Sequence, residues 1–228
     1  MEVTPRQMRE TAREYAYRTL KENIIMLRLV PGSMVSEKEL ADEMGISRTP
    51  TREALIELSK SYIVDIIPQR GSFISKIDYS LVDEARFMRL ILEKAVVEIV
   101  CEEGSEKDFR DLETNIKLQE FYLDSGSVGK FFQMDNAFHK KLFLISNKMQ
   151  VYQLMSSMMI HFDRVRLMRL HSDKELEDIL YDHVSILEAL RQRNKEVASK
   201  LMTKHLSRYK VDEELIRREH PDYFLNEG

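Results

Sequence analysis

Residues 37–52 read EKELADEMGISRTPTR, the pattern of a short helix, a glycine turn and a second helix that opens with hydroxyl and arginine side chains. Ser36 and Glu39 have the spacing of a capping box, which starts the first helix. Gly45 supplies the turn between the two helices. The stretch therefore predicts a helix-turn-helix, although a three-helix domain without a binding role produces the same pattern.

The first turn of the second predicted helix carries side chains that suit DNA recognition. Ser47 or Thr49 can cap this helix, and Arg48, Thr49 and Arg52 project from its N-terminal turn. In a helix-turn-helix protein this turn meets base edges and phosphates in the major groove. The start of this helix is therefore the candidate DNA-contacting surface.

Residues 63–75 read IVDIIPQRGSFIS, two β-branched runs around a Pro-Gln-Arg-Gly turn. This pattern predicts a hairpin, and a hairpin that follows a recognition helix is a wing. Arg70 would lie at its tip, near phosphate or the minor groove, and Gly71 would let the backbone approach DNA closely. The alternative for Arg70 is a solvated turn charge, because surface charges often contribute little.

Composition narrows the class of protein. The chain has 228 residues, of which 43% are hydrophobic, as in soluble globular proteins with one or two domains. No apolar run could span a membrane, and the first residues lack the apolar stretch of a signal peptide, so we expect a cytoplasmic protein without a membrane partner. Cys101 is the only cysteine, which leaves histidines and carboxylates as candidate metal ligands. Although the net charge is −4, the first 76 residues hold 12 Lys/Arg against 11 Asp/Glu, so a basic surface must be local.

The remaining chain has a helical period almost throughout. A stripe of apolar residues predicts a scaffold helix over residues 10–27. After the hairpin, Ser80-x-x-Asp83 is a predicted cap, and we expect helices at 80–103, 106–124, 129–146, 149–171, 174–192 and 194–218. Short connections make neighbouring helices antiparallel. The predicted fold is mainly α, with an N-terminal winged helix-turn-helix domain at 1–77 and an antiparallel α-helical bundle at 78–228.

Three histidines and one aspartate lie on apolar helix faces of the predicted bundle. Asp135 and His139 are four residues apart and point the same way among aromatic residues, while His183 and His205 lie in leucine-rich stripes. Burying such polar groups costs free energy unless they have partners, and one divalent cation could bind all four. This ligand set suits Zn²⁺, Ni²⁺, Mn²⁺ or Fe²⁺ about equally and leaves room for exogenous oxygens. The alternative is an Asp135–His139 ion pair and two unrelated core histidines. His171 is expected on the surface.

Arginines near these faces are candidate anion ligands. Arg89 stands four residues before Glu93, partly on the apolar side of its helix, where an inward guanidinium invites an anion. The alternative is a border salt bridge of little energetic weight. Arg166 and Arg169 are further candidates, and His161 receives no assignment.

Several motifs together resemble a known family, the GntR superfamily of bacterial transcription regulators. The winged-helix resemblance rests on Leu29-Val30-Pro31-Gly32, Glu37-x-Glu39-Leu40-Ala41, Gly45-Ile46-Ser47-Arg48-Thr49-Pro50-x-Arg52-Glu53-Ala54-Leu55 and Pro68-x-x-Gly71-x-Phe73. The bundle, with Asp135-x-x-x-His139, His183 and Met202-x-x-His205-Leu206, is similar to the metal-binding form of the FCD-type effector domain in the FadR subfamily. The resemblance implies a dimeric, operator-binding regulator whose bundle holds a metal and often a small carboxylate effector.

The resemblance also implies roles for single residues. It places DNA contacts at Lys38, Ser47, Arg48, Thr49, Arg52 and Gly71, metal ligands at Asp135, His139, His183 and His205, and an effector-contacting arginine at Arg89. Lys38 departs from the arginine that is frequent at its position and so lacks a bidentate fork. Tyr62 replaces the glycine usual after the recognition helix, so the chain must leave that helix at higher backbone cost or by another route.

The sequence therefore predicts a ligand-responsive transcription regulator rather than an enzyme. It would bind a palindromic double-stranded operator as a homodimer and respond to a small carboxylate at the metal site. Two alternatives remain at this point. The metal could be purely structural, or the open coordination position could activate water in a metal-dependent enzyme, although no motif places a general base beside the ligands.

Overall fold

The computed structural model describes residues 1–170, 173–208 and 213–225, and these form two compact units. The first unit contains Met1–Val82, Ile160–Arg164 and the described chain from Glu213 onward. The second contains Asp83–Met159 and the described residues that follow Arg164 as far as Arg208. The domain boundary expected after residue 77 stays a prediction, because compactness alone does not test whether each part folds by itself.

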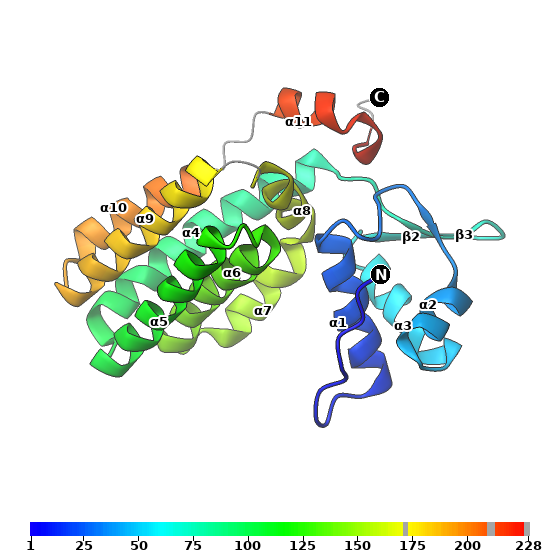
Figure 1. Cartoon of the computed structure of the whole chain (residues 1–228), viewed down its shortest axis with the longest axis horizontal. Coiled ribbons are helices and arrows are strands. Elements are labelled where there is room, and N and C mark those ends of the chain that lie inside the picture. Colours follow the sequence, from blue (N-terminus) through cyan, green and yellow to red (C-terminus); the bar gives the residue numbers. More distant parts are fainter. Residues whose placement is uncertain (171–172, 209–212, 226–228) are drawn as a thin grey trace. The chain divides into compact units, whose positions relative to one another are not determined.

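The first unit is a winged helix-turn-helix, as predicted. Its elements are α1 (Ala12–Ile25), β1 (Met34–Val35), α2 (Glu37–Met44), α3 (Arg48–Ser59), β2 (Val64–Ile67) and β3 (Gly71–Ile74) (Figure 1). The strands form an antiparallel sheet in the order β1-β3-β2. Fully buried Leu20, Ile24 and Leu58 join the helices to Ile63 and Ile74 of the hairpin in one core. The sequence did not predict β1, because two residues are too few to show an alternating pattern.

The ends of α2 and α3 follow the predicted local signals with one refinement. Ser36 Oγ accepts a hydrogen bond from the Glu39 amide at 3.4 Å, and Gly45 ends α2 in the left-handed conformation with φ +65°. Ser47 occupies the N-cap of α3, but its side chain makes no capping bond. Its carbonyl instead accepts from the hydroxyl of buried Thr51 at 3.2 Å. Helix α2 therefore begins with a side-chain cap, whereas α3 begins without one.

The chain leaves α3 through a left-handed backbone conformation at Tyr62. Its φ is +59°, so it takes the left-handed conformation that a glycine would take, at a cost of about 1–2 kcal/mol. The Tyr62 side chain itself is exposed. The wing hairpin that follows pairs Ile67 with Gly71, which leaves residues 68–70 as its tip.

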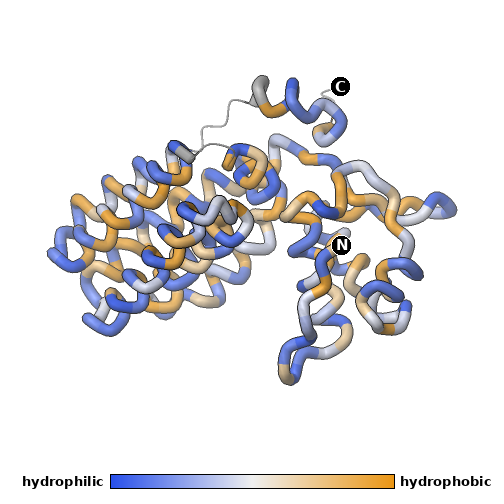
Figure 2. Tube along the Cα trace, in the orientation of Figure 1, coloured by the Kyte–Doolittle hydropathy of each residue, from blue (hydrophilic) through white to orange (hydrophobic). Residues whose placement is uncertain are grey.

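The second unit is a helical bundle. Its helices are α4 (Tyr79–Glu103, of which residues 83–103 belong to this unit), α5 (Glu106–Asp124), α6 (Val128–Ile145), α7 (Met149–Met158), α9 (Asp173–Arg191) and α10 (Lys195–Ser207). Hydrophobic and hydrophilic residues alternate along these helices with a helical period (Figure 2). Phe109, Phe131, Phe138 and Phe143 are fully buried in the core. Polar side chains that share these inward faces must therefore find partners inside the bundle.

Three expectations about helix ends need correction. The helix expected at 149–171 is interrupted at Met159 and continues as α8 (Ile160–Arg169). Residues 194–218 hold α10 and then α11 (Glu213–Glu219), with a short 3₁₀ turn at Pro221–Tyr223. His171, residue 172 and residues 209–212 lie outside the described chain.

The third correction concerns the start of α4, where Ser80 is the predicted cap. The carboxylate of Asp78 takes this role instead, because it accepts a hydrogen bond from the Ser80 amide at 2.9 Å.

Candidate metal centre and DNA-binding surface

The four predicted metal ligands come together inside the bundle. Helix α6 presents Asp135 and His139 from adjacent turns, α9 presents His183, and α10 presents His205. All four side chains are buried, with exposed fractions of 0–2%. One potential ligand atom from each lies within 4.8 Å of the others. Three helices therefore place one oxygen and three nitrogens around a common point.

The inward atoms of this cluster are one aspartate oxygen and imidazole Nε2 atoms. The Nε2 atoms of His139 and His205 are 3.2 Å apart, and His183 Nε2 is 3.7 Å from Asp135 Oδ1. Two nitrogens that each lie about 2.0–2.1 Å from one cation are about 2.9 Å apart at adjacent positions of an octahedral ion and about 3.3 Å apart on a tetrahedral one. Within the described residues, His183 Nε2 and Asp135 Oδ1 have no hydrogen-bond partner. The spacing of these atoms and their unmet hydrogen-bonding capacity both suit a cation.

The outer nitrogen of each histidine faces an acceptor. His139 Nδ1 is 2.5 Å from a Glu93 oxygen, and His183 Nδ1 is 2.8 Å from the Gln119 side-chain oxygen. His205 Nδ1 is 3.5 Å from an oxygen of Asp182. An acceptor at Nδ1 favours a proton on that atom, and such a proton would leave the lone pair on Nε2, which is the usual arrangement around metal-bound histidines.

The proton positions of His139 and His205 determine whether their Nε2 atoms attract or repel each other. If His139 and His205 are both protonated at Nδ1, their two Nε2 lone pairs face each other across 3.2 Å. Without a cation, this arrangement is repulsive. Burial also lowers the pKa of His139 to about 4, so the ring is neutral near pH 7 and presents a lone pair there. The group could therefore hold a divalent cation, and its donor chemistry fits one.

Arg166 is the main ionic partner of Asp135. Its Nη2 donates to Asp135 Oδ2, and its Nη1 donates to the Asn136 side-chain oxygen at 2.8 Å. Burial raises the pKa of Asp135, but the charge of Arg166, followed by those of the neighbouring histidines and Arg89, holds it well below its usual range. Asp135 is therefore ionised at neutral pH, as a metal ligand must be.

Arg89 lies one contact away from the predicted ligands. It is buried, and its Nε donates to Glu93 Oε1 at 2.7 Å, while the other Glu93 oxygen faces His139. Burial raises the pKa of Glu93, but Arg89 and His139 outweigh it and lower the pKa to about 2. The Arg89–Glu93 pair is therefore an internal ion pair beside the cluster, not a border salt bridge.

Sequence reasoning missed the roles of Gln119 and Asp182. Gln119 lies on the apolar face of α5, three residues after Ile116, which was a visible signal of an inward polar group. Asp182 accepts from Arg208 Nε at 2.5 Å, and with Glu93 and Gln119 it completes the set of Nδ1 partners. Nothing in the spacing links Asp182 to His205, because the two residues lie on different helices.

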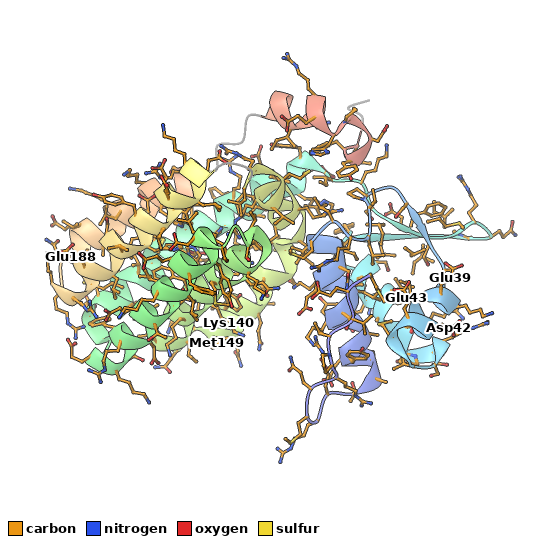
Figure 3. The ribbon with its side chains drawn as sticks, in the orientation of Figure 1. Glu39, Asp42, Glu43, Lys140, Met149 and Glu188 are labelled. Atoms are coloured by element: carbon orange, nitrogen blue, oxygen red, sulfur yellow. The ribbon has the colours of Figure 1, made fainter. Side chains whose placement is uncertain are left out.

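The predicted DNA-contacting residues are all solvent-accessible. All seven are exposed: Ser47, Arg48, Thr49 and Arg52 at or near the start of α3, Lys38 on α2, Arg70 at the wing tip, and Gly71 at the start of β3. Arg52 is only loosely paired, with Nε 3.9 Å from a Glu37 oxygen. The acidic residues Glu39, Asp42 and Glu43 project from α2 (Figure 3). Among the residues that the structure describes, the arginines of α3 and the wing therefore have no tight ion pair that would compete with phosphate.

A winged helix-turn-helix followed by a helical bundle defines a class of DNA-binding proteins. Comparison with known families agrees with this class. The family of bacterial regulatory proteins called gntR matches residues 12–74, and the FCD domain family matches residues 84–208. The chain belongs to the GntR family of bacterial transcription regulators and carries an FCD C-terminal domain.

Individual relatives match over nearly the whole chain. The HTH-type transcriptional repressor RspR of Escherichia coli is 31% identical over 211 residues, which is 92% of each chain. A regulator encoded in an unstable DNA locus of Streptomyces ambofaciens is 32% identical over 96% of this chain and 92% of its own. The E. coli McbR/YncC structure has the same fold, with a TM-score of 0.80 at 18% identity over 92% of this chain and 99% of its own. These relatives are regulators, and this protein is a transcription regulator rather than an enzyme.

Across residues 1–170, 173–208 and 213–225, no helix combines the length and the apolar character needed to cross a membrane.

Proposed function

We propose that the protein is a cytoplasmic, ligand-responsive regulator that binds a divalent cation in its FCD domain and a palindromic operator through its winged helix. The observation that carries the metal site is the convergence of three imidazoles and Asp135, each imidazole with an acceptor behind its outer nitrogen. Asp135, His139, His183 and His205 would hold the cation. When bound, the cation supplies a Lewis-acidic centre with open positions for an oxygen ligand.

The effector of this regulator is proposed to be a small carboxylate. Four protein ligands leave one or two coordination positions for a carboxylate oxygen on a cation that accepts five or six ligands. The guanidinium of Arg89 is close enough to lower the pKa of both Asp135 and His139. Its positive charge therefore acts on the proposed cation site. Arg89 would balance the charge of the effector carboxylate after exchanging its bond with Glu93. The effector alters operator affinity only as far as it binds two arrangements of the protein unequally.

The operator surface is proposed to consist of Lys38, Ser47, Arg48, Thr49, Arg52, Arg70 and Gly71. A single recognition helix covers few base pairs, so two copies of the chain are needed to read an extended site. We expect a homodimer at micromolar concentration in analytical ultracentrifugation, and footprinting should protect two half-sites. A monomer that protects one half-site would contradict this proposal.

Metal content is the direct test of the proposed cation site. We expect purified protein, prepared without chelators and resupplied with Zn²⁺, to hold about one equivalent, and we expect His183→Ala and His205→Ala to hold much less. Each substitution removes one of four ligands and leaves a poorer site. Elemental analysis measures the occupancy, and His220→Ala, a half-buried histidine outside the cluster, is the matched control. Equal zinc in all four proteins would leave ordinary core histidines as the explanation.

The same preparations separate a regulatory cation from a structural one. Chelation should lower the melting temperature in either case, because the cation stabilises the folded state in proportion to its binding. Only a regulatory site should also respond to small carboxylates, with a change in operator affinity that disappears in Arg89→Met. A carboxylate response that persists in Arg89→Met would remove Arg89 from the effector site.

A further inference from the structure

Helix α8 belongs to both compact units. Its first part, Ile160–Arg164, is part of the winged-helix unit, and its remaining residues, from Val165, are part of the bundle. The whole helix also lies inside the stretch that matches the FCD domain, residues 84–208. A piece of the effector domain is therefore built into the DNA-binding unit.

The first part of α8 bonds to the base of the wing. His161 Nε2 donates to the Tyr62 carbonyl at 2.9 Å, and His161 Nδ1 accepts from the Asp78 amide at 3.1 Å. Tyr62 precedes β2 and Asp78 follows β3, so one imidazole joins both ends of the wing hairpin. Arg164 Nη1 donates to the Ser75 carbonyl at 2.8 Å, and its Nη2 donates to His161 Nδ1 at 2.9 Å.

These contacts lie in the interior of the unit. His161 is 2% exposed and Arg164 is fully buried. Burial, with the charge of Arg164, lowers the pKa of His161 to about 4, so the ring is neutral with its proton on the nitrogen that faces Tyr62. A helix that only had to pack here could use apolar side chains at lower desolvation cost. Instead, both residues use polar groups to fix three backbone positions of the wing.

The second part of α8 bonds to the candidate metal centre. Arg166 follows Arg164 by two residues and donates to Asp135 and Asn136 of α6. The Asp135 oxygen that faces His183 is Oδ1, whereas the oxygen bound to Arg166 is Oδ2. A cation and Arg166 can therefore share the carboxylate. A cation bound at Oδ1 would thus leave Oδ2 in contact with Arg166 of α8.

We propose that α8 couples the metal centre to the wing, with Arg166 as the contact on Asp135 and His161 and Arg164 as positioning residues for residues 62–78. The proposal rests on the proposed function, because it requires the cation. Binding of the cation orders Asp135 and Arg166, a more ordered α8 holds the wing base more firmly, and Arg70 at the wing tip is presented to DNA in a narrower range of positions. The coupling follows the covalent continuity of one helix and the hydrogen bonds within each unit.

Hydrogen exchange in the full-length protein tests this coupling with zinc alone as the probe. In the wild type, Zn²⁺ should slow exchange in peptides covering residues 62–78 by about tenfold, the effect of one additional stable hydrogen bond. In the double variant His161→Gln, Arg164→Gln, the same peptides should exchange faster and no longer respond to zinc. Zinc content and the zinc-dependent protection of α6 should stay as in the wild type. Arg70→Gln, at the wing tip and without a bond to α8, is the control that should keep the full response.

Arg166→Gln is a second variant, which tests the coupling even if the double variant fails to fold. It leaves the wing-base bonds in place but weakens the contact with Asp135, so it should bind zinc and lose the response at residues 62–78. Zinc bound to the wild type without any change at residues 62–78 would overturn the coupling and leave the proposed metal site standing. A wing base that still responds in folded Arg166→Gln would overturn it as well. Absence of zinc from the wild type would overturn both proposals.

Discussion

Replacing Arg166 with methionine is expected to lower the free energy of unfolding of the metal-free protein by about 3–5 kcal/mol, the usual cost of removing one partner of a buried ion pair. Arg166 and Asp135 are both almost fully buried, and the substitution leaves the carboxylate without its main ionic partner. With Zn²⁺ bound, the loss should be clearly smaller, because the cation neutralises the same carboxylate. Denaturant unfolding in chelator and in excess zinc measures both values.

Arg191→Met is the matched control for this experiment. Arg191 pairs with Glu113 at 2.6 Å, but both side chains are more than a third exposed, so the loss should be far smaller than for Arg166→Met. It should also be the same with and without zinc. If Arg166→Met cost no more than Arg191→Met, Asp135 would not depend on Arg166 for its charge, and the assignment of this ion pair would be wrong.

Alanine at Arg48 or Arg52 is expected to weaken specific operator binding by about 1–3 kcal/mol each, if each reads a guanine edge. Both side chains are exposed at the start of α3, so their removal disturbs no core packing. An operator fragment selected from a random-sequence library by the wild type provides the DNA, and titration at fixed salt gives the affinities.

Arg110→Ala controls for the simple loss of a positive charge. Arg110 is exposed on α5 in the bundle, so its removal should change operator affinity little. Wild-type affinity in a folded Arg48→Ala, Arg52→Ala double variant would exclude α3 as the recognition helix. Loss of affinity at every salt concentration with an unchanged preference among sequences would assign both arginines to phosphates rather than bases.

The features that local chemistry determines could be predicted from the sequence. Gly45 is needed where the chain turns left-handed, and β-branched residues on both sides of residues 68–70 favour a hairpin, so the winged helix-turn-helix follows from short stretches. The spacing of Asp135 and His139 places both on one face of α6 by helix geometry alone. His183 and His205 each follow from the apolar stripe around them. These predictions needed only the period of a helix or a strand.

The features that long-range contacts determine could not be predicted. The break at Met159 has no glycine or proline to mark it, and α8 starts where His161 can bond to Tyr62, 99 residues earlier in the chain. No helical period reveals such a partner. The same holds for Gln119 behind His183, which is 64 residues distant in sequence. The four residues of the buried cluster could thus be predicted individually, whereas Gln119 and the other residues behind the histidines appear only once the helices are packed together.

The burial of all four ligand side chains governs how quickly a cation could come and go. With exposed fractions of 0–2%, none of them meets bulk water, so a chelator cannot reach a bound cation while the helices stay closed. Exchange must wait for a local opening of the bundle, and its rate is then set by that opening rather than by ligand strength. The fraction of protein that holds a cation would therefore be set by the cations present when the chain folded, and it would change only slowly afterwards.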